Sequence, residues 1–401
     1  MNEAPASAAP IANGGATPLL LGRAWLPQAD GPVVVTVRDG EVVDITSALA
    51  PTVRDICEMP DPAAYVAKAA GQSIGSIETL LEDSRIAPAS DNPVDVAGQR
   101  ARPWLLAPID LQAIKASGVT FVVSLLERVI EEQAKGSPEK AAAIRNDIHG
   151  LIGHDLSRLV PGSPEAMQIK QALISKGVWS QYLEVGIGPD PEIFTKSQPM
   201  SAVGPGADIG ILPTSTWNNP EPEIAVVVSS SGQIVGATLG NDVNLRDVEG
   251  RSALLLGKAK DNNASCALGP FLRLFDQGYG LDDVKQAEIR LTVDGPEGYR
   301  LDGASSMSRI SRSPEALVAA AMGSNHQYPD GMVLFLGTMF APIQDRDVPG
   351  QGFTHRIGDV VGIETATLGR LVNRVLHCGD CAPWNYGVSH LMRSLAARKL
   401  L

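Results

Sequence analysis

Short apolar runs separated by glycine, asparagine and aspartate turns fill much of the chain from Ile209 onward. The runs have the length and the valine, isoleucine and leucine content of strands rather than helices. The clearest runs are residues 223–228, 234–239, 289–293 and 332–336. Because turns follow one another so closely, this spacing predicts an antiparallel or mixed sheet folded over on itself, and not a doubly wound parallel sheet.

The N-terminal part of the chain predicts a small α+β domain. Residues 33–37 and 41–45 are apolar runs joined by Asp39-Gly40, a pair typical of a tight hairpin turn. Short helices with capping residues are expected near residues 60–69 and 76–82. A stretch rich in proline, alanine, aspartate and serine, residues 85–102, resembles a linker. We therefore predict an N-terminal domain over residues 1–103.

The rest of the chain, residues 104–401, is predicted to be the catalytic domain. Its early part is polar and charged from about residue 127 to residue 178, and it is broken at Gly136-Ser-Pro and at Pro161-Gly-Ser-Pro. This pattern predicts a helical insertion in an otherwise strand-rich plan. The predicted fold class is therefore α+β and β-rich, with a mixed sheet, a helical insertion and the small N-terminal domain.

Charge and apolar content limit the partners of this chain. A formal net charge of −12 argues against nucleic acid and anionic membranes, because both would be repelled over most of the surface. No run of about 18 apolar residues occurs. The N-terminus has no basic patch followed by an apolar stretch, so we expect no secretory signal. Together with only four cysteines, these features predict a cytoplasmic protein.

Two of the four cysteines, Cys378 and Cys381, have the spacing of a redox pair or a zinc knuckle and follow His377. The pair stands without a second Cys-x-x-Cys or a pair of histidines. We therefore interpret these residues as loop cysteines.

Three carboxylates suggest a metal site. Glu221 and Glu223 stand two apart at the start of an apolar run, so their side chains would point to the same face of a strand. The next run ends in Asn241-Asp242, where a turn can direct a third carboxylate to the same place. Such oxygen ligands suit Mg²⁺ or Mn²⁺ better than zinc. From the spacing alone, a solvated strand edge and an ordinary turn remain the alternative.

The motifs around these residues resemble the fumarylacetoacetate hydrolase family. The resemblance is specific because several motifs occur in the same order between residues 219 and 375. They are residues 219–228, 236–247, 259–263, 268–270, 331–338, 358–364 and 368–375. The resemblance implies the fold of that family, and it implies that Glu221, Glu223 and Asp242 hold Mg²⁺, with Mn²⁺ as a substitute.

Further site residues follow from this resemblance. It implies that the ion chelates the carboxylate and 2-keto oxygen of a small 2-keto acid and stabilises an enolate. Lys260 matches the active-site lysine of the family, whereas Lys258 is expected at the surface. Arg246 is expected to contact the substrate or to pair with Asp247. Gly337 and Thr338 are expected to offer backbone and hydroxyl donors to the substrate carboxylate.

Two departures from the family pattern bear on the reaction. Family hydrolases carry a histidine and a glutamate that activate water, but here Ser124 stands in place of the histidine while Glu127 remains. Glu249 stands where the family usually has glutamine near the substrate. His149 and His154 fall in the helical insertion, where one of them is a candidate lid residue. The loss of the histidine makes hydrolysis of a diketone a poor fit.

The resemblance to the sugar-acid dehydratase branch of the family gives a working hypothesis. Members of this branch convert 2-keto-3-deoxy-pentonates such as 2-dehydro-3-deoxy-D-arabinonate to 2,5-dioxopentanoate. We predict a hydro-lyase in which Glu127 and Lys260 act as base and acid and Ser124 orients a hydroxyl. The alternatives are a hydrolase of an acylpyruvate or 2,4-diketo-3-deoxy sugar acid, and a non-catalytic metal-binding interaction protein. The resemblance also suggests a homodimer or homotetramer.

Overall fold

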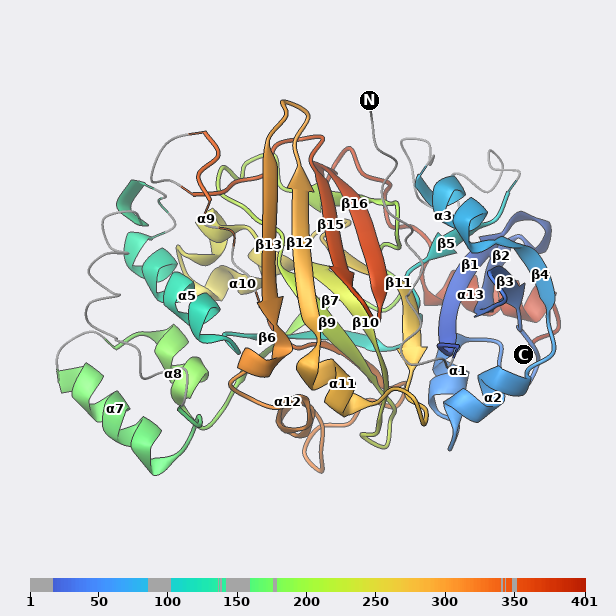
Figure 1. Cartoon of the computed structure of the whole chain (residues 1–401), viewed down its shortest axis with the longest axis horizontal. Helices are drawn as coiled ribbons and strands as arrows, with labels where there is room; N and C mark the ends of the chain where they lie inside the picture. The colour runs from blue at the N-terminus through green and yellow to red at the C-terminus, as the bar shows by residue number, and fades with distance from the viewer. Residues whose placement is uncertain are drawn as a thin grey trace.

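The structure, a computed structural model, describes most of the chain. The described residues are 17–85, 102–135, 137, 139–141, 159–175, 179–339, 342, 344–347 and 352–401. Two β-sheets lie against each other at the centre of the molecule, with helices at both ends (Figure 1). Residues 86–101 of the predicted linker and both histidines of the insertion, His149 and His154, lie outside the described residues.

The larger sheet has eleven strands, in the order β4-β3-β2-β1-β11-β10-β9-β14-β6-β7, with β5 paired to β1. Its strands are β1 (Leu20–Leu26), β2 (Gly31–Arg38), β3 (Glu41–Asp44), β4 (Gln72–Ser76), β5 (Trp104–Leu106), β6 (Ala113–Gly118), β7 (Glu192–Ser197), β9 (Pro222–Val228), β10 (Ile234–Asp242), β11 (Cys266–Leu274) and β14 (Met332–Phe335). The pair β14·β6 is parallel and the other pairs are antiparallel. The sheet is therefore mixed, as the turn spacing predicted.

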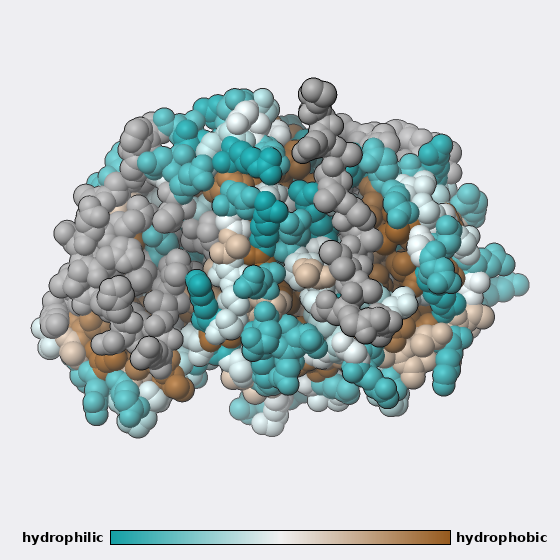
Figure 2. All heavy atoms as spheres, in the orientation of Figure 1, coloured by the Kyte–Doolittle hydropathy of each residue, from teal (hydrophilic) through white to brown (hydrophobic). Residues whose placement is uncertain are grey.

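The smaller sheet has five strands, in the order β13-β12-β15-β16-β8. They are β8 (Asp208–Ile211), β12 (Glu288–Asp294), β13 (Arg300–Ser306), β15 (Val360–Thr365) and β16 (Gly369–His377). On the outer face of β12, Glu288, Arg290 and Asp294 are exposed. Hydrophilic side chains predominate over this part of the surface (Figure 2). The alternation of exposed and buried residues along β12 shows that one face of this sheet is exposed to solvent.

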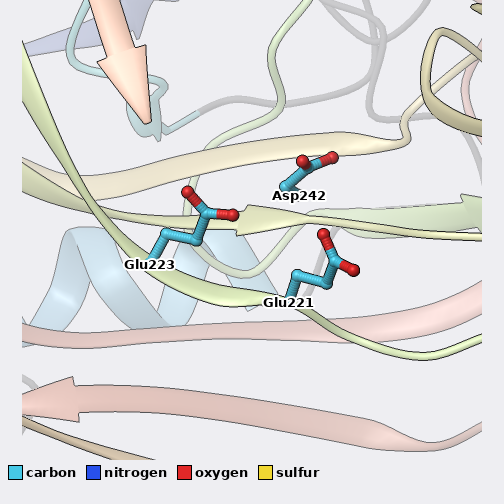
Figure 3. A group of neighbouring side chains, drawn as sticks. All are labelled: Glu221, Glu223 and Asp242. Carbon is cyan, nitrogen blue, oxygen red and sulfur yellow. The ribbon is translucent and has the colours of Figure 1, made fainter. Parts of the chain in front are cut away.

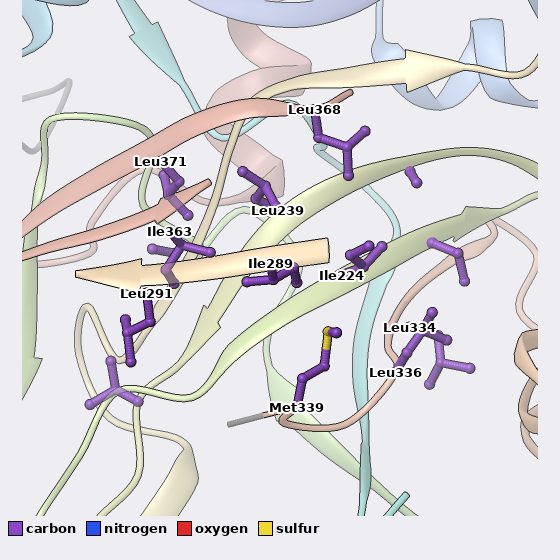
Figure 4. Close-up of a cluster of buried hydrophobic side chains, with 14 of the residues drawn as sticks. Ile224, Leu239, Ile289, Leu291, Leu334, Leu336, Met339, Ile363, Leu368 and Leu371 are labelled. Carbon is purple, nitrogen blue, oxygen red and sulfur yellow. The ribbon is translucent and has the colours of Figure 1, made fainter. Parts of the chain in front are cut away.

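The main core fills the space between the two sheets. Ile224 and Leu239 of the larger sheet meet Ile289, Leu291 and Ile363 of the smaller one (Figure 4). These side chains are at most 2% exposed. Burying an aliphatic side chain of this size contributes about 1.5–3 kcal/mol. The inward-facing residues of the strands that carry the candidate ligands are thus held in a packed interior.

The N-terminal segment forms the predicted hairpin and short helices. β2 and β3 are joined by Asp39 and Gly40, both with positive φ (51° and 81°), as an Asp-Gly turn requires. The helices are α1 (Val53–Cys57), α2 (Pro62–Lys68) and α3 (Ile77–Arg85). β1 pairs with β11, so the sheet is continuous across the boundary predicted at residue 103. The division of the chain into two domains remains a prediction.

The helical insertion lies at the end of the molecule opposite the N-terminal strands (Figure 1). It contains α5 (Val122–Ala134) and α7 (Pro164–Ser175), and α8 (Gln181–Ile187) follows it. α5 ends just before the predicted break at Gly136, and α7 starts within the second predicted break. Its buried apolar side chains, such as Leu125 and Val129, form a separate cluster with Leu183 and Trp217.

The remaining helices are short. They are α9 (Arg246–Glu249), α10 (Leu256–Lys260), α11 (Leu281–Gln286), α12 (Pro314–Ala321) and α13 (Val388–Ala397), with the 3₁₀ turns η1 (Pro27–Ala29), η3 (Ala253–Leu255) and η4 (Met307–Arg309). α9 and α10 come directly after β10 and precede β11. Over the described ranges, we find no helix with the length and apolar character needed to span a bilayer.

Candidate metal and substrate site

The three predicted ligands come together where β9 begins and β10 ends. β10 runs antiparallel to β9, with Gly240 opposite Glu223. The Asp242 N–H donates to the Glu221 carbonyl at 3.1 Å, which places Glu221 beside Asp242. One oxygen of each carboxylate lies within 4.8 Å of the others, and the three side chains converge on one space (Figure 3). All three residues are at most 2% exposed.

Asn241 explains how this arrangement forms without a turn. We expected a turn at Asn241-Asp242, but β10 continues through both residues. The Asn241 side-chain oxygen accepts from the Glu221 N–H at 3.1 Å, so the asparagine ties the start of one strand to the end of the next. The side-chain amide thus performs a positioning role that the sequence pattern did not indicate.

Three cations surround the carboxylates. The Lys260 Nζ lies 2.5 Å from Glu221 Oε2 and 3.0 Å from Asp242 Oδ2. The Lys196 Nζ lies 3.0 Å from Asp242 Oδ1. Arg128 donates to Glu221 Oε1. Both oxygens of Glu221 and of Asp242 are therefore in contact with positive charge.

The protonation preferences of the carboxylates differ sharply. Burial raises the pKa of Glu223 well above its usual range, and the charges of Asp242 and Glu221 raise it further. Burial also opposes ionisation of Glu221, but Arg128 and Lys260 outweigh it and hold its pKa at about 2. Burial disfavours the ammonium of Lys260, yet Asp242 and Glu221 raise its pKa above the ordinary value. Lys260 is consequently protonated in this arrangement.

The residues of the site fit a hard divalent cation. Carboxylate oxygens are the ligands that Mg²⁺ and Mn²⁺ prefer. Burial is the main cause of the raised pKa of Glu223, and repulsion by the charges of Asp242 and Glu221 adds to it. A divalent ion would remove this repulsion. Within the described ranges, no other group of three carboxylate, imidazole or thiol ligands comes together, and none forms around Cys378 and Cys381.

Arg246, one of the predicted substrate-binding residues, contacts other side chains of the protein. Arg246 is buried, donates to the Asn219 side chain at 2.8 Å and lies over the ring of Trp217. The alternative partner, Asp247, accepts from the Ser215 hydroxyl and the Thr216 N–H, both at 2.8 Å. Arg246 therefore holds Asn219, two residues before Glu221, where the chain leads into β9.

Gly337 differs from the expectation. Its N–H was expected to face the substrate, but it donates to Glu223 Oε2 at 2.7 Å, so its contact orients a candidate metal ligand. Gly337 has φ of +99°, and an added Cβ would lie 1.9 Å from the Thr120 hydroxyl, so only glycine fits here. The next residue, Thr338, is buried at the same end of β14.

The predicted acid–base residues on α5 are only partly described. Glu127 is 5% exposed and directly precedes Arg128 on the helix. Ser124 lies one turn earlier, with its side chain outside the described part of the structure. Glu249, at the end of α9, lies 3.2 Å from Arg128. Arg128 therefore joins the helical insertion to both Glu221 and Glu249.

Three residues of the site escaped the sequence analysis: Arg128, Lys196 and Glu192. Arg128 and Lys196 looked like ordinary surface cations, because nothing in the local pattern shows which carboxylates they will meet. Glu192 opens β7, and its carboxylate crosses the face of Gly118 on β6, where an added Cβ would collide with it. Burial, followed by the charge of Glu249, raises the pKa of Glu192 to about 7. The pairing of Gly118 with Glu192 on neighbouring strands marks this site, but it is visible in the structure and not in the local sequence.

Comparison with known proteins gives a family match over the part of the chain that carries this site. Residues 180–376 match the family model described as "Fumarylacetoacetate (FAA) hydrolase C-terminal". A probable 2-keto-3-deoxyxylonate dehydratase of Haloferax volcanii is 34% identical over 194 residues, which are 48% of this chain and 63% of that protein. A 2-dehydro-3-deoxy-D-arabinonate dehydratase of Saccharolobus solfataricus is 31% identical over 185 residues, 46% of this chain and 58% of that protein.

The matched segments thus span about three fifths of the length of these curated relatives. A solved structure of 2-keto-3-deoxy-D-arabinonate dehydratase, described as complexed with magnesium and 2,5-dioxopentanoate, aligns with a TM-score of 0.60. The alignment covers 89% of this chain and 99% of that one, with 20% sequence identity. This likeness establishes the predicted strand-rich α+β fold.

Proposed function

We propose that this chain, whose residues 180–376 match the model of the fumarylacetoacetate hydrolase family, is a Mg²⁺-dependent dehydratase of a 2-keto-3-deoxy sugar acid. The observation that carries the proposal is the buried triad of Glu221, Glu223 and Asp242 with the ammonium of Lys260 against it. The relatives named as sugar-acid dehydratases support the substrate class. A 2-dehydro-3-deoxy-D-pentonate, giving 2,5-dioxopentanoate and water, is the proposed reaction.

Glu221, Glu223 and Asp242 would hold the metal ion. A bound divalent ion supplies Lewis acidity, which draws electron density from a 2-keto group and makes the C3 proton easier to remove. The Asn241 side chain and the Gly337 N–H position Glu221 and Glu223 for this role.

The chain's own side chains then move the protons. Glu192, with a pKa of about 7, is suited to accept a proton from C3 near neutral pH. The protonated Lys260 would balance negative charge that develops on the substrate. Glu127 remains a candidate to protonate the departing C4 hydroxyl, which Ser124 would orient.

The proposed reaction balances as an elimination. The C3–H and C4–O bonds break, a double bond forms between C3 and C4, and the hydroxyl leaves as water. Loss of a proton from C5 and gain of one at C3 then give an enol with its double bond between C4 and C5. Loss of the enol hydroxyl proton and gain of a proton at C4 give the aldehyde of 2,5-dioxopentanoate. Dehydration is favoured over hydrolysis because Ser124 stands where the hydrolases of the family carry the histidine that activates water.

The remaining predicted site residues are assigned to the two ends of the substrate. Thr338, at the end of β14, and Arg246, beside Glu221, are proposed to contact the substrate carboxylate directly or through water. Glu249 would hold Arg128 where a sugar hydroxyl enters. A homodimer or homotetramer is part of the proposal, and light scattering of the purified chain tests it.

The decisive assay supplies a 2-keto-3-deoxy-pentonate and Mg²⁺ to the purified chain and follows 2,5-dioxopentanoate. We expect this product to form with Mg²⁺ and to disappear on chelation. Pyruvate with an aldehyde as sole products would instead show aldol cleavage, and turnover of an acylpyruvate to two acids would show a hydrolase. Failure of a 2-keto acid to exchange C3 hydrogen with deuterated solvent would point to a non-catalytic metal-binding protein.

A further inference from the structure

Lys196 has an environment that its position on a strand does not lead one to expect. It lies near the end of β7, and its side chain has no solvent exposure. A lysine is rarely buried to this degree unless its charge is paired. The residue before it, Thr195, faces outward and accepts from Lys115 of the neighbouring strand at 2.8 Å. Strand alternation therefore places Lys196 on the inner face.

The ammonium of Lys196 contacts four groups from two segments of the site. It lies 3.0 Å from Asp242 Oδ1 and donates to the Lys260 carbonyl. It also lies 3.3 Å from the Val243 carbonyl and 3.4 Å from the Ser265 hydroxyl. One buried cation thus joins the end of β10, which carries a candidate ligand, to the end of α10, which carries Lys260.

These contacts hold both Asp242 and Lys260 in place, and the proposed reaction depends on the positions of these two residues. The ion pair with Asp242 Oδ1, at 3.0 Å, restricts the rotation of that carboxylate. The bond to the Lys260 carbonyl fixes the backbone from which the Lys260 side chain reaches Asp242 Oδ2. Partners outside the ligand set commonly orient metal ligands in this way.

We propose that Lys196 is a positioning residue that holds Asp242 as a metal ligand and sets Lys260 against it. The inference rests on the proposed metal function of the triad. The Lys196 ammonium contacts Asp242 and the Lys260 carbonyl, so its effect passes through these two residues. A residue that only stabilised the fold would change the unfolding temperature and leave the metal affinity of the folded protein unchanged.

The test is a calorimetric titration of the full chain with Mn²⁺, comparing wild type with Lys196→Met. We expect Mn²⁺ to bind Lys196→Met on the order of 10- to 100-fold more weakly. At saturating metal, kcat should also fall while KM for the 2-keto acid changes little. The matched control is Lys115→Met, which removes a lysine from the neighbouring strand without touching the site.

The outcomes separate the inference from the proposed function. Equal Mn²⁺ affinity in Lys196→Met and wild type would overturn the inference and leave the metal site intact. Failure of wild type itself to bind Mn²⁺ would overturn the metal site. If Lys196→Met does not fold, adding Asp242→Asn should restore folding, because the buried carboxylate that would otherwise depend on Lys260 for positive charge is then gone. If Asp242→Asn gives no gain in stability, the Lys196–Asp242 ion pair is not the reason that Lys196 is needed.

Discussion

Two buried clusters of charge in this molecule are built from similar groups and have opposite electrostatic outcomes. In the first, Asp359 accepts from both terminal nitrogens of Arg346, at 2.6 and 2.7 Å, and lies 2.9 Å from His355. Burial opposes ionisation of Asp359, but these partners hold its pKa at about 2. In the second, Glu223 shares its space with Glu221 and Asp242, and its pKa is raised.

The difference lies in which carboxylates the cations contact. Asp359 accepts from both terminal nitrogens of Arg346, in the bidentate geometry that gives the strongest pairs, and Arg346 also contacts Glu297. The triad has three carboxylates around one site, and its cations contact Glu221 and Asp242. A fully paired carboxylate supports the fold, whereas a crowded one is prepared for a ligand that brings positive charge. Changes in the two clusters should therefore have different consequences.

The largest expected effect comes from Glu223→Gln. The change removes a candidate metal ligand, so kcat/KM should fall on the order of 10³-fold or more, since several kcal/mol of Lewis-acid stabilisation is lost. The metal-free protein should be as stable as wild type or more stable, because a disfavoured buried charge is gone. Steady-state kinetics and urea unfolding in the presence of chelator measure the two effects. A large loss of stability would show that the triad is a structural cluster.

Asp359→Asn should have the reverse profile. The change removes the carboxylate that the buried Arg346 meets with both terminal nitrogens and leaves Glu297 as its partner, so the unfolding free energy should fall by roughly 1–3 kcal/mol. The folded fraction should keep Mn²⁺ affinity close to that of wild type. Thermal unfolding and a metal titration of the same sample provide both numbers. If Asp359→Asn loses metal affinity and keeps its stability, the Asp359 cluster serves metal binding rather than the fold, and the two clusters do not differ as proposed.

Glu192→Gln tests whether the group with a pKa of about 7 serves the chemistry. A base must be deprotonated, so the rate of the wild type should rise with pH up to about 7 and then level off. In Glu192→Gln, kcat should fall about 100-fold and this rise should disappear. The pH profile of kcat separates this role from a general loss of structure. A variant that is slower but keeps the rise would assign the titration to another group.

Acid should weaken the Asp359 cluster by a smaller amount. The pKa of Asp359 is about 2 in the folded chain and 3.8 is its ordinary value, so ionisation favours the folded state. This contribution, roughly 2 kcal/mol, is complete above pH 3.8 and is lost as the pH falls toward 2. The stability difference between wild type and Asp359→Asn, measured by urea unfolding at several pH values, should shrink over that window. A constant difference would show that the pair contributes by packing alone.

Much of the strand plan could be predicted because it depends on local pattern. The Asp39-Gly40 hairpin and the two-residue spacing of Glu221 and Glu223 are determined by neighbours in the sequence. Lys196 and Arg128 could not be predicted in the same way. Each lies tens of residues from the carboxylate it meets, and a cation on a strand or helix looks the same whether it faces solvent or a buried partner.

The pairing of β1 with β11 has a consequence for how the chain can be divided. The family match begins at residue 180, so β1 lies outside it in sequence, yet β1 is hydrogen-bonded to β11 along one edge. Removing the N-terminal strands would leave β11 as a bare edge, next to the strand that ends at Asp242. Bare edges recruit other strands and promote aggregation. A truncated chain that begins at the family match alone should therefore be poorly soluble, because the N-terminal strands cover this edge.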